Sequence, residues 1–272
     1  MPNSTNAAVV AALLGPEDSP AYDIVNPKGA AALLIICDHA SHAVPRALGQ
    51  LGLSDAELRR HIGWDIGAAE VARRLSARLD APLVLAGYSR LVIDCNRGLG
   101  DPSSMPEVSD GVVVPGNAGL SAAARVARVN ACFKPYHDAI AGQLAAFALR
   151  GIAPVVLSVH SFTPVMNGIE RPWHVGVLWD KDPRVPVPLI AELAAADPRR
   201  VVGDNQPYSA KEPAGYSIRT HAEAAGLPHA AVELRQDLID TPAGAEYWGE
   251  ALAAALRPIL AKPDLFRAER VS

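Results

Sequence analysis

The sequence predicts an α/β protein with a largely parallel sheet. The chain has 272 residues, of which half are apolar and a fifth charged, and this is enough to bury a sizeable core. Short aliphatic runs alternate with longer stretches of helical character, as expected for strands joined by helices. No linker and no repeat divides the chain. We therefore expect a single domain over residues 1–272, with residues 1–20 as a loosely packed N-terminal arm.

Strands are predicted where β-branched and aliphatic residues form short runs between turn-forming residues. These runs are Leu33–Cys37, Leu83–Ala86, Leu91–Asp94, Pro154–His160, Val175–Trp179, Arg200–Val202 and Ala230–Arg235. Helices are predicted for longer stretches, namely Ser54–Arg60, Ile66–Leu79, Ser121–Arg150, Pro186–Ala196, Ser217–Ala225 and Gly244–Ala261. Pro135 lacks a backbone N–H and clashes with the preceding turn, so the third helix should kink or divide there.

Three segments are too rich in Gly, Pro and polar residues for regular structure: Gly98–Gly119, Ser161–Pro172 and Gly203–Gly215. Each follows a predicted strand, and ligands of open α/β sheets sit beyond the carboxyl ends of strands. Long loops in compact domains are more often functional than idle. We therefore expect these segments to wall a pocket above one edge of the sheet, with simple surface excursions as the alternative.

Charge, hydropathy and cysteine content exclude several classes of protein. The net charge is −4 and the basic residues are scattered, which argues against a nucleic-acid partner. No apolar run approaches the roughly 20 residues of a membrane helix, and residues 7–14 lack the basic flank of a secretory signal. Cys37, Cys95 and Cys132 form no Cys-x-x-Cys pair, so neither a disulfide framework nor a thiolate zinc site is expected. Dinucleotide, nucleotide and serine-hydrolase motifs are absent as well. These features favour a cytoplasmic protein that binds no membrane.

Two histidines, His39 and His160, end separate predicted strands. They can converge at one sheet edge, and imidazole is the commonest protein ligand of zinc. A catalytic zinc needs three protein ligands and one open position. Asp65 is the leading third ligand, although an Asp at a helix start also caps backbone amides, and Asp38 and Asp94 compete for the position. The alternative for His39 is a loop histidine hydrogen-bonded to backbone.

His42 follows His39 at a His-x-x-His spacing, which would chelate a metal on a helix. Pro45 and the small residues nearby predict a turn instead. We therefore expect His42 to line the pocket rather than to bind the metal.

A cluster of guanidinium and amide groups follows another apolar run, at Arg90, Asn96 and Arg97. Arginine binds carboxylates with two parallel hydrogen bonds, and the neighbouring amide supplies further donors. The segment is therefore a candidate site for an anionic small substrate, with a structural ion pair to Asp94 as the alternative. Arg171 is a weaker candidate of the same kind.

Glu233 places a carboxylate within an apolar strand. Burying a carboxylate is costly unless it is paired, metal-bound or catalytic. Beside a metal-bound water it can accept the water's proton and later pass that proton to a leaving amine. The alternative is a salt bridge to Arg235 or to an arginine of another strand, since residues two apart on a strand share a face.

Seven separated blocks of sequence occur in a characteristic order: Asp38-His39-Ala40-Ser41 with Val44-Pro45, Gly63-Trp64-Asp65-Ile66-Gly67, Ser89-Arg90-Leu91 running to Asn96-Arg97, His160-Ser161-Phe162-Thr163-Pro164, Arg171-Pro172-Trp173, Asp204-Asn205 with Pro207-Tyr208-Ser209, and Glu233-Leu234-Arg235-Gln236-Asp237-Leu238. Together, over most of residues 21–260, they resemble the N-formylglutamate amidohydrolase family. The specificity lies in the ordered set rather than in any one block.

The resemblance implies a fold similar to zinc carboxypeptidases, a three-layer sandwich with a mixed, mostly parallel sheet between helical layers. It also implies hydrolysis of an N-formyl or related N-acyl amino acid, such as N-formyl-L-glutamate, to formate and the free amino acid. Carried onto this chain, the resemblance makes His39, Asp65 and His160 ligands of a divalent metal, expected to be zinc, Glu233 the general base, and Arg90, Asn96 and Arg97 the residues that hold the substrate's carboxylates. His42 departs from the family, which commonly has Asn there.

Two other functions stay open at the level of sequence. One is a deacylase of the same fold that acts on a different N-acyl acid. The other is a non-catalytic homologue that binds carboxylates. In each case the expected partner is a small anionic molecule, and the sequence does not indicate an oligomeric state.

Overall fold

The structure is a computed structural model that describes residues 13–211 and 215–269. Within these ranges, seven strands form one sheet in the order β1-β3-β2-β6-β11-β9-β10. The strands are β1 (Tyr22–Val25), β2 (Leu33–Cys37), β3 (Leu83–Ala86), β6 (Val155–Phe162), β9 (Val175–Leu178), β10 (Val202–Asp204) and β11 (His229–Arg235). Most of the predicted N-terminal arm, at residues 1–12, lies outside the described residues.

The sheet is mixed and mostly parallel, as predicted. Strands β3, β2, β6 and β11 run in the same direction, and β10 is parallel to β9. The edge strand β1 is antiparallel to β3, and β9 is antiparallel to β11. The carboxyl end of β9 therefore lies beside the amino end of β11, where Leu178 is paired with Ala231.

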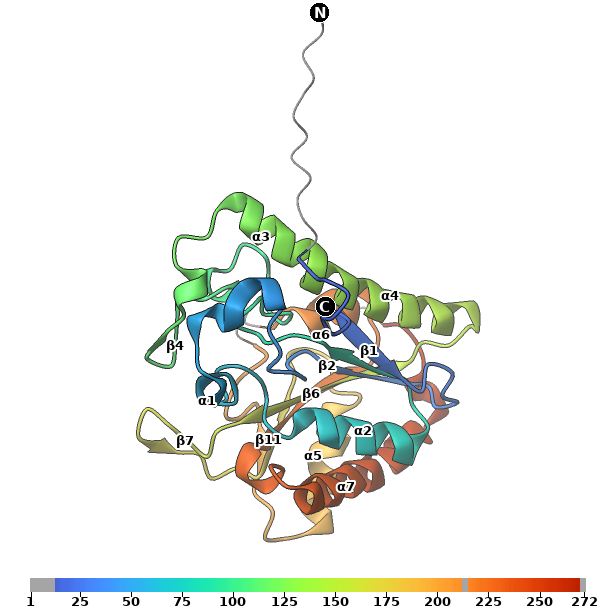
Figure 1. Cartoon of the computed structure of the whole chain (residues 1–272). Coiled ribbons are helices and arrows are strands. Elements are labelled where there is room, and N and C mark those ends of the chain that lie inside the picture. The colour runs from blue at the N-terminus through green and yellow to red at the C-terminus, as the bar shows by residue number, and fades with distance from the viewer. Residues whose placement is uncertain (1–12, 212–214, 270–272) are drawn as a thin grey trace, which may run out of the picture.

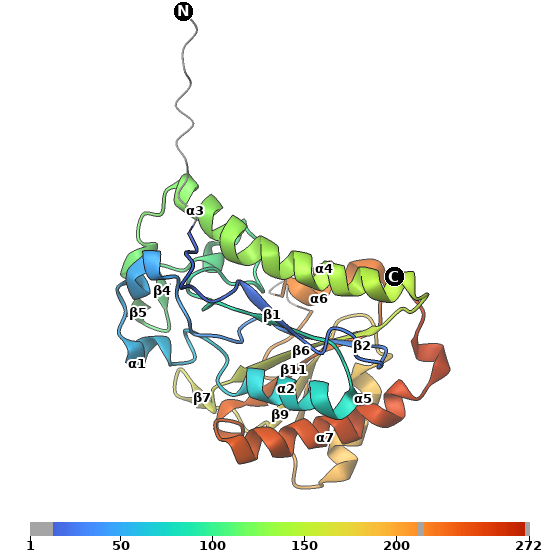
Figure 2. The ribbon, with the colours of Figure 1, turned by 45° about the vertical axis from the view of Figure 1, so that its right-hand side comes forward.

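Helices cover both faces of the sheet and complete a three-layer sandwich (Figures 1 and 2). One face carries α2 (Ala68–Leu79), α5 (Pro186–Ala196) and α7 (Pro242–Leu260). The other carries α4 (Lys134–Leu149) and α6 (Ser217–His221), and α3 (Ala122–Arg128) leads into α4. The layered architecture confirms the predicted fold class.

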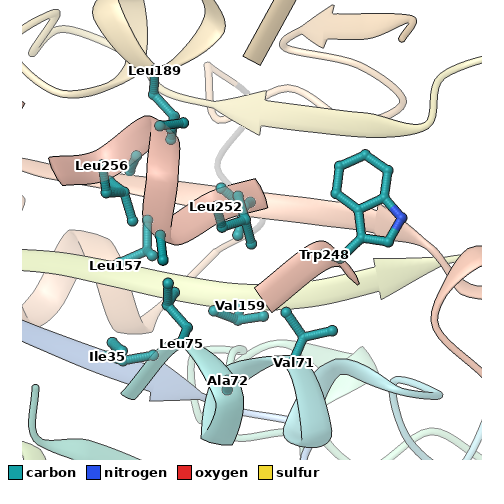
Figure 3. Close-up of a cluster of buried hydrophobic side chains, with 14 of the residues drawn as sticks. Ile35, Val71, Ala72, Leu75, Leu157, Val159, Leu189, Trp248, Leu252 and Leu256 are labelled. Atoms are coloured by element: carbon teal, nitrogen blue, oxygen red, sulfur yellow. The ribbon is translucent and has the colours of Figure 1, made fainter. Parts of the chain in front are cut away.

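Alternate residues of each strand supply the two cores, because successive side chains on a strand point to opposite faces. In β2, Leu33 and Ile35 face α2 and α7, whereas Leu34 and Ile36 face α4. Figure 3 shows part of the first core, where strand residues meet apolar side chains of the helices; the labelled residues are Ile35, Val71, Ala72, Leu75, Leu157, Val159, Leu189, Trp248, Leu252 and Leu256. This continuous packing fixes the positions of the strands. The strands in turn fix the positions of the polar residues at their ends.

Local signals explain where several helices begin. Ser54 starts α1 (Asp55–Leu58) with a capping box, in which its hydroxyl accepts a hydrogen bond from the backbone N–H of Glu57. The hydroxyls of Ser121 and Thr241 cap α3 and α7 in the same way. Short 3₁₀ turns occupy Arg46–Gly52, Pro102–Ser104, Pro115–Asn117, Glu223–Ala225, Gln236–Leu238 and Pro263–Leu265.

The long predicted helix Ser121–Arg150 is divided near Pro135, as expected. A π-helical turn at Val129–Phe133 separates α3 from α4. Proline has no N–H for the regular i to i−4 bond, so the hydrogen-bond pattern widens in the preceding turn.

One predicted strand is wrong. Leu91–Asp94 forms turns rather than a strand, although its residues are buried. Local bonds satisfy its backbone: the N–H of Val92 donates to Ser89, and that of Asp94 donates to Ser104. The Arg128 guanidinium also donates to the Val92 carbonyl, at 3.0 Å. A buried apolar run has no periodicity that separates a strand from a well-bonded loop.

Two of the predicted loop segments contain β-hairpins. The first is β4 (Val108–Ser109) with β5 (Val112–Val113), and the second is β7 (Val165–Met166) with β8 (Ile169–Glu170). Asp-Gly and Asn-Gly at their tips have positive φ at both positions, which is the geometry of a two-residue hairpin turn. Both hairpins project from the same side of the sheet (Figure 1). Among the described residues, no helix combines the length and apolar character needed to cross a bilayer.

Candidate metal centre and its cavity

Two imidazoles meet at the carboxyl ends of neighbouring parallel strands. His39 follows β2 after one intervening residue, and His160 lies near the end of β6. Because β2 and β6 are paired in parallel, both side chains reach the same sheet edge. Their ring centroids are 5.1 Å apart. The predicted convergence of these two histidines is therefore present in the structure.

Asp65 lies between the two rings. Its Oδ2 is 3.2 Å from Nδ1 of His39 and 2.8 Å from Nδ1 of His160. The backbone N–H of Asp65 donates to the His39 carbonyl, which ties this segment to the end of β2. Gly67 follows with a φ of 79° and sits so close to the Ile239 carbonyl that a Cβ would collide with it. Gly67 thus lets the chain turn into α2 directly after Asp65. No side chain caps that helix, so the capping alternative for Asp65 is not observed.

The two competing aspartates hold the opposite nitrogens of the rings. Asp94 Oδ1 is 2.7 Å from Nε2 of His39, and Asp38 Oδ2 is 3.2 Å from Nε2 of His160. A carboxylate on the far nitrogen of a histidine fixes the rotation of the ring and makes the other nitrogen a better metal ligand. Asp38 and Asp94 therefore contact the Nε2 atoms, which face away from Asp65, and both Nδ1 atoms are directed towards Asp65.

This donor set fits a divalent cation. One ligand atom from each of His39, Asp65 and His160 lies within 4.8 Å of the others, and all three residues are buried. Two imidazoles and a carboxylate are the ligands of many catalytic zinc sites. Burial alone would raise the pKa of Asp65, but the charge of His39 and the hydrogen bond from His160 outweigh it and hold the pKa below its usual range. A carboxylate that stays ionised in a buried position is suited to bind a cation.

Glu233 lies beside this group, on the neighbouring strand. It lies on β11, in register with His160 on β6. The residue is 8% exposed, and its Oε2 has no hydrogen-bond partner among the described residues. Burial, reinforced by the Asp65 charge, raises the pKa of Glu233 to about 7. Arg235, the alternative partner considered from the sequence, donates instead to Asp237 at 2.8 Å.

Arg90 forms the structural ion pair that the sequence left open as an alternative, and it also faces the cavity. Its guanidinium donates to Asp94 Oδ2 at 2.8 Å and lies 3.4 Å from Asp65 Oδ1. It also lines the cavity in front of the histidines. Burial alone would raise the pKa of Asp94. The charges of Arg90 and His39 outweigh this effect and hold the pKa well below its ordinary value. The ion pair therefore orients a guanidinium towards the cavity and at the same time supports the carboxylate behind His39.

Asn96 and Arg97 line the same cavity, and their binding of substrate stays a prediction. Asn96 Oδ1 accepts hydrogen bonds from the backbone N–H groups of Tyr216 and Ser217, at 2.8 and 3.1 Å. This places the start of α6 next to the segment that carries the two residues. Arg97 donates to the Asn96 carbonyl at 3.0 Å.

Two other sequence candidates lie outside the cavity lining. Arg171 donates to the Tyr208 hydroxyl at 3.0 Å, and its guanidinium lies 5.0 Å from the centre of the Tyr208 ring. Tyr208 itself does line the cavity, so Arg171 stands behind it. The His42 ring is 5.0 Å from the Trp64 ring and does not belong to the His39–Asp65–His160 group among the described residues.

The cavity has a volume of about 430 Å³, within the range typical of small-molecule sites. One wall is the segment after β10, from which Asn205 and Tyr208 face the cavity. This segment rests on Gly176 of β9, where a Cβ would collide with the Gln206 carbonyl. Of the three predicted loop segments, Gly203–Gly215 thus contributes most to the wall and Ser161–Pro172 contributes Ser161. The expectation was wrong for Gly98–Gly119, because no lining residue comes from that segment.

Sequence reasoning did not single out Trp179 and His229, which also line the cavity, and it found Tyr208 only as part of a loop segment and a family block. His229 could have been noticed, because it shares a strand face with Glu233 at a spacing of four residues. Tyr208 and Trp179 carry no such periodic signal, since they lie in or next to irregular segments.

Comparisons with known proteins relate the whole chain, rather than the site alone, to a family and a fold. The model of the family described as N-formylglutamate amidohydrolase matches residues 31–240. The structure of a gene product from Agrobacterium tumefaciens aligns with a TM-score of 0.85 and 35% identity, over 91% of this chain and 99% of that one. An N-formylglutamate amidohydrolase from Ralstonia eutropha shares the fold, with a TM-score of 0.55 and 20% identity over 88% and 96% of the two chains.

More distant matches add little. A metallo-carboxypeptidase from Burkholderia cenocepacia aligns with a TM-score of 0.33 and 12% identity, over 89% of this chain and 65% of that one, a likeness too weak to carry an argument. No curated protein matches the sequence.

Proposed function

The chain belongs to the N-formylglutamate amidohydrolase family, and on that premise we propose that it is a metal-dependent hydrolase of N-formyl or related N-acyl amino acids. The products would be formate, or the corresponding acid, and the free amino acid. The observation that carries the proposal is the position of the Glu233 carboxylate, whose Oε2 lacks a hydrogen-bond partner in the described part of the chain, beside His39, Asp65 and His160. Those three residues would hold the metal, for which zinc suits the donor set.

When bound, a divalent cation at these residues supplies Lewis acidity, which polarises an amide carbonyl and lowers the pKa of water from about 16 towards about 7. Asp94 and Asp38 keep the two rings turned so that their Nδ1 atoms face the ligand position.

Glu233 would move the proton. Its unpartnered Oε2 accepts a proton from the attacking water as the new C–O bond forms. The same oxygen then donates that proton to the departing nitrogen as the C–N bond breaks. A pKa raised to about 7 suits both steps at neutral pH, because the group can take up and release a proton with little driving force.

Arg90, Asn96 and Arg97 would hold the carboxylate of the amino acid. All three line the cavity that opens in front of Glu233. Guanidinium groups bind carboxylates in a fixed orientation, so binding remote from the reacting amide would align the scissile bond. A substrate that lacks the carboxylate should therefore lose turnover as well as affinity. Arg171 would contribute by holding Tyr208 at the cavity wall.

Elemental analysis of the purified protein, together with an assay for released formate, tests the proposal. Hydrolysis of N-formyl amino acids that is lost with a chelator and restored by zinc is the expected result. Binding of amino acids without any turnover in the metal-loaded protein would indicate a non-catalytic homologue. Turnover restricted to other acyl groups would indicate a different deacylase.

A further inference from the structure

The cavity lies between the sheet and helix α6. On β11, Val232 and Leu234 pack into the core shared with α2 and α7, whereas Glu233 between them lines the cavity. His160 lines it from the neighbouring strand β6. Because successive side chains of a strand point to opposite faces, these polar groups lie on the face that α6 covers. Residues of α6 that line the cavity therefore form its wall opposite the candidate base.

Polar contacts hold α6 at both ends. At its start, the Ser217 hydroxyl donates to Oδ1 of Asp38 at 2.5 Å, and Oδ2 of the same aspartate is 3.2 Å from Nε2 of His160. At its end, Nε2 of His221 lies 2.9 Å from Nδ1 of His137 on α4. A side chain that leaves α6 between these two contacts thus starts from a fixed position relative to the candidate metal ligands.

Arg219 is such a side chain, and it lines the cavity. Two other guanidinium groups line the cavity in the described part of the chain, those of Arg90 and Arg97. Both belong to the segment that, with Asn96, would hold the carboxylate of the amino acid. Arg219 comes from a separate element. A second carboxylate on the same substrate can therefore meet a guanidinium that the first one does not use.

Glu223 holds Arg219 only loosely. Nε of Arg219 is 3.8 Å from Oε2 of Glu223, which is longer than a hydrogen bond, and the Arg219 side chain is 53% exposed. Ion pairs of this kind contribute little, because solvent screens them and two long side chains must be ordered. Glu223 also lines the cavity, in the turn that follows α6. A substrate carboxylate can thus displace Glu223 from the guanidinium without a large loss.

We propose that Arg219 is a specificity-determining residue that binds a carboxylate on the substrate's side chain, and that Glu223 competes with this carboxylate for the guanidinium. The inference rests on the proposed function for its class of substrate. It goes further in naming the residue that recognises the side chain and the residue that opposes it. N-formyl-L-glutamate and N-formyl-L-glutamine form a matched pair of probes, because they have the same length and differ only in the terminal group.

The test compares kcat/KM for the two probes. We expect the wild-type protein to favour N-formyl-L-glutamate about tenfold or more, since hydrogen bonds between charged groups are stronger than those to an amide. Arg219→Gln should reduce this preference about tenfold, and Arg219→Lys should reduce it less, because the ammonium keeps the charge but not the two parallel donors. Glu223→Gln should raise the preference about threefold, because it removes the competing carboxylate.

A matched control is Arg74→Gln. Arg74 also pairs with a glutamate four residues away on its own helix, Glu70 of α2, but it lies outside the cavity lining. The control should leave the ratio of the two probes unchanged. Equal use of the probes by the wild type, an unaltered ratio in Arg219→Gln, or a ratio that fails to rise in Glu223→Gln would overturn the assignment.

Calorimetric binding of free L-glutamate and L-glutamine to the metal-loaded wild type and to Arg219→Gln separates this inference from the proposed function. A glutamate preference in binding that Arg219→Gln removes, without hydrolysis of either probe, would support the role of Arg219 and reject the proposed activity. Hydrolysis of both probes at a ratio that Arg219→Gln leaves unaltered would do the reverse.

Discussion

Glu233 is paired in register with His160 on the neighbouring parallel strand. The sheet itself, rather than a flexible loop, therefore sets the separation of the candidate base from a candidate metal ligand. Groups held on strands keep their geometry more closely than groups on loops, which matters when a misplacement of 1 Å is costly.

Replacing the base tests its role directly. Glu233→Gln should lower kcat at least 100-fold, since the amide cannot accept the proton of water, while the metal content stays unchanged. Formate release and elemental analysis provide the two measurements. Glu192→Gln, at an exposed position of α5, is the control and should keep full activity. Retained turnover in Glu233→Gln would remove this residue from the base role.

The carboxylate behind His39 should control metal affinity. Asp94→Asn weakens the 2.7 Å contact to Nε2 of His39, so we expect the dissociation constant for zinc to rise 10- to 100-fold. Competition with a chromogenic chelator measures this without any substrate. Asp101→Asn removes a carboxylate that caps an exposed turn in the same segment and should leave the affinity unchanged. Equal affinity in both variants would contradict the orienting role of Asp94.

A buried histidine should make stability depend on pH. Burial lowers the pKa of His137 to about 4, from an ordinary value of 6.5. Between these values the unfolded chain binds a proton at His137 that the folded protein does not bind. The stability contribution is thus complete above about pH 6.5 and is lost as the pH falls towards 4, by about 3 kcal/mol.

Urea unfolding of the wild type and of His137→Phe at pH 7.5 and pH 4.5 isolates this effect. The variant should lose less unfolding free energy between the two values than the wild type does. Its Nε2 bond to the Cys95 carbonyl, at 3.0 Å, is lost at both pH values and so cancels in the comparison. Identical losses would show that His137 protonates freely in the folded protein.

The cavity wall after β10 should be sensitive to a single methyl group. In Gly176→Ala the new Cβ collides with the Gln206 carbonyl, so the wall must shift. We expect a loss of about 1–3 kcal/mol in the free energy of unfolding and a raised KM. Gly142→Ala on α4 meets open space and should instead stabilise the helix by up to about 1 kcal/mol. A normal KM in Gly176→Ala would show that the wall does not touch substrate.

Several of the strands, and the convergence of the two histidines, can be predicted from the sequence. The runs Leu33–Cys37 and Leu83–Ala86 coincide with β2 and β3, because buried central strands are short, aliphatic and bounded by turn residues. The convergence of His39 and His160 could be predicted for the same reason, since parallel strands bring their carboxyl ends to one edge. The roles assigned to the site residues stay predictions.

Other features depend on tertiary contacts that the sequence does not show. Asp38, Asp65 and Asp94 are equivalent carboxylates in the sequence, and the rotation of two imidazole rings decides which of them lies between the Nδ1 atoms. Arg171 is directed to Tyr208 only once the segment after β10 has packed on β9. The direction of β9 is hidden as well, because parallel and antiparallel strands that are buried on both faces share the same composition.

That reversed direction has a consequence for how related enzymes can diverge. Leu178 is paired with Ala231 near the amino end of β11 only because β9 runs against it, while the candidate base Glu233 lies towards the opposite end. Under the proposed function, substitutions near Leu178 should change which amino acid the cavity accepts without displacing Glu233. Energetic effects of substitutions at the two ends should accordingly be additive, so new selectivities are accessible by small independent steps.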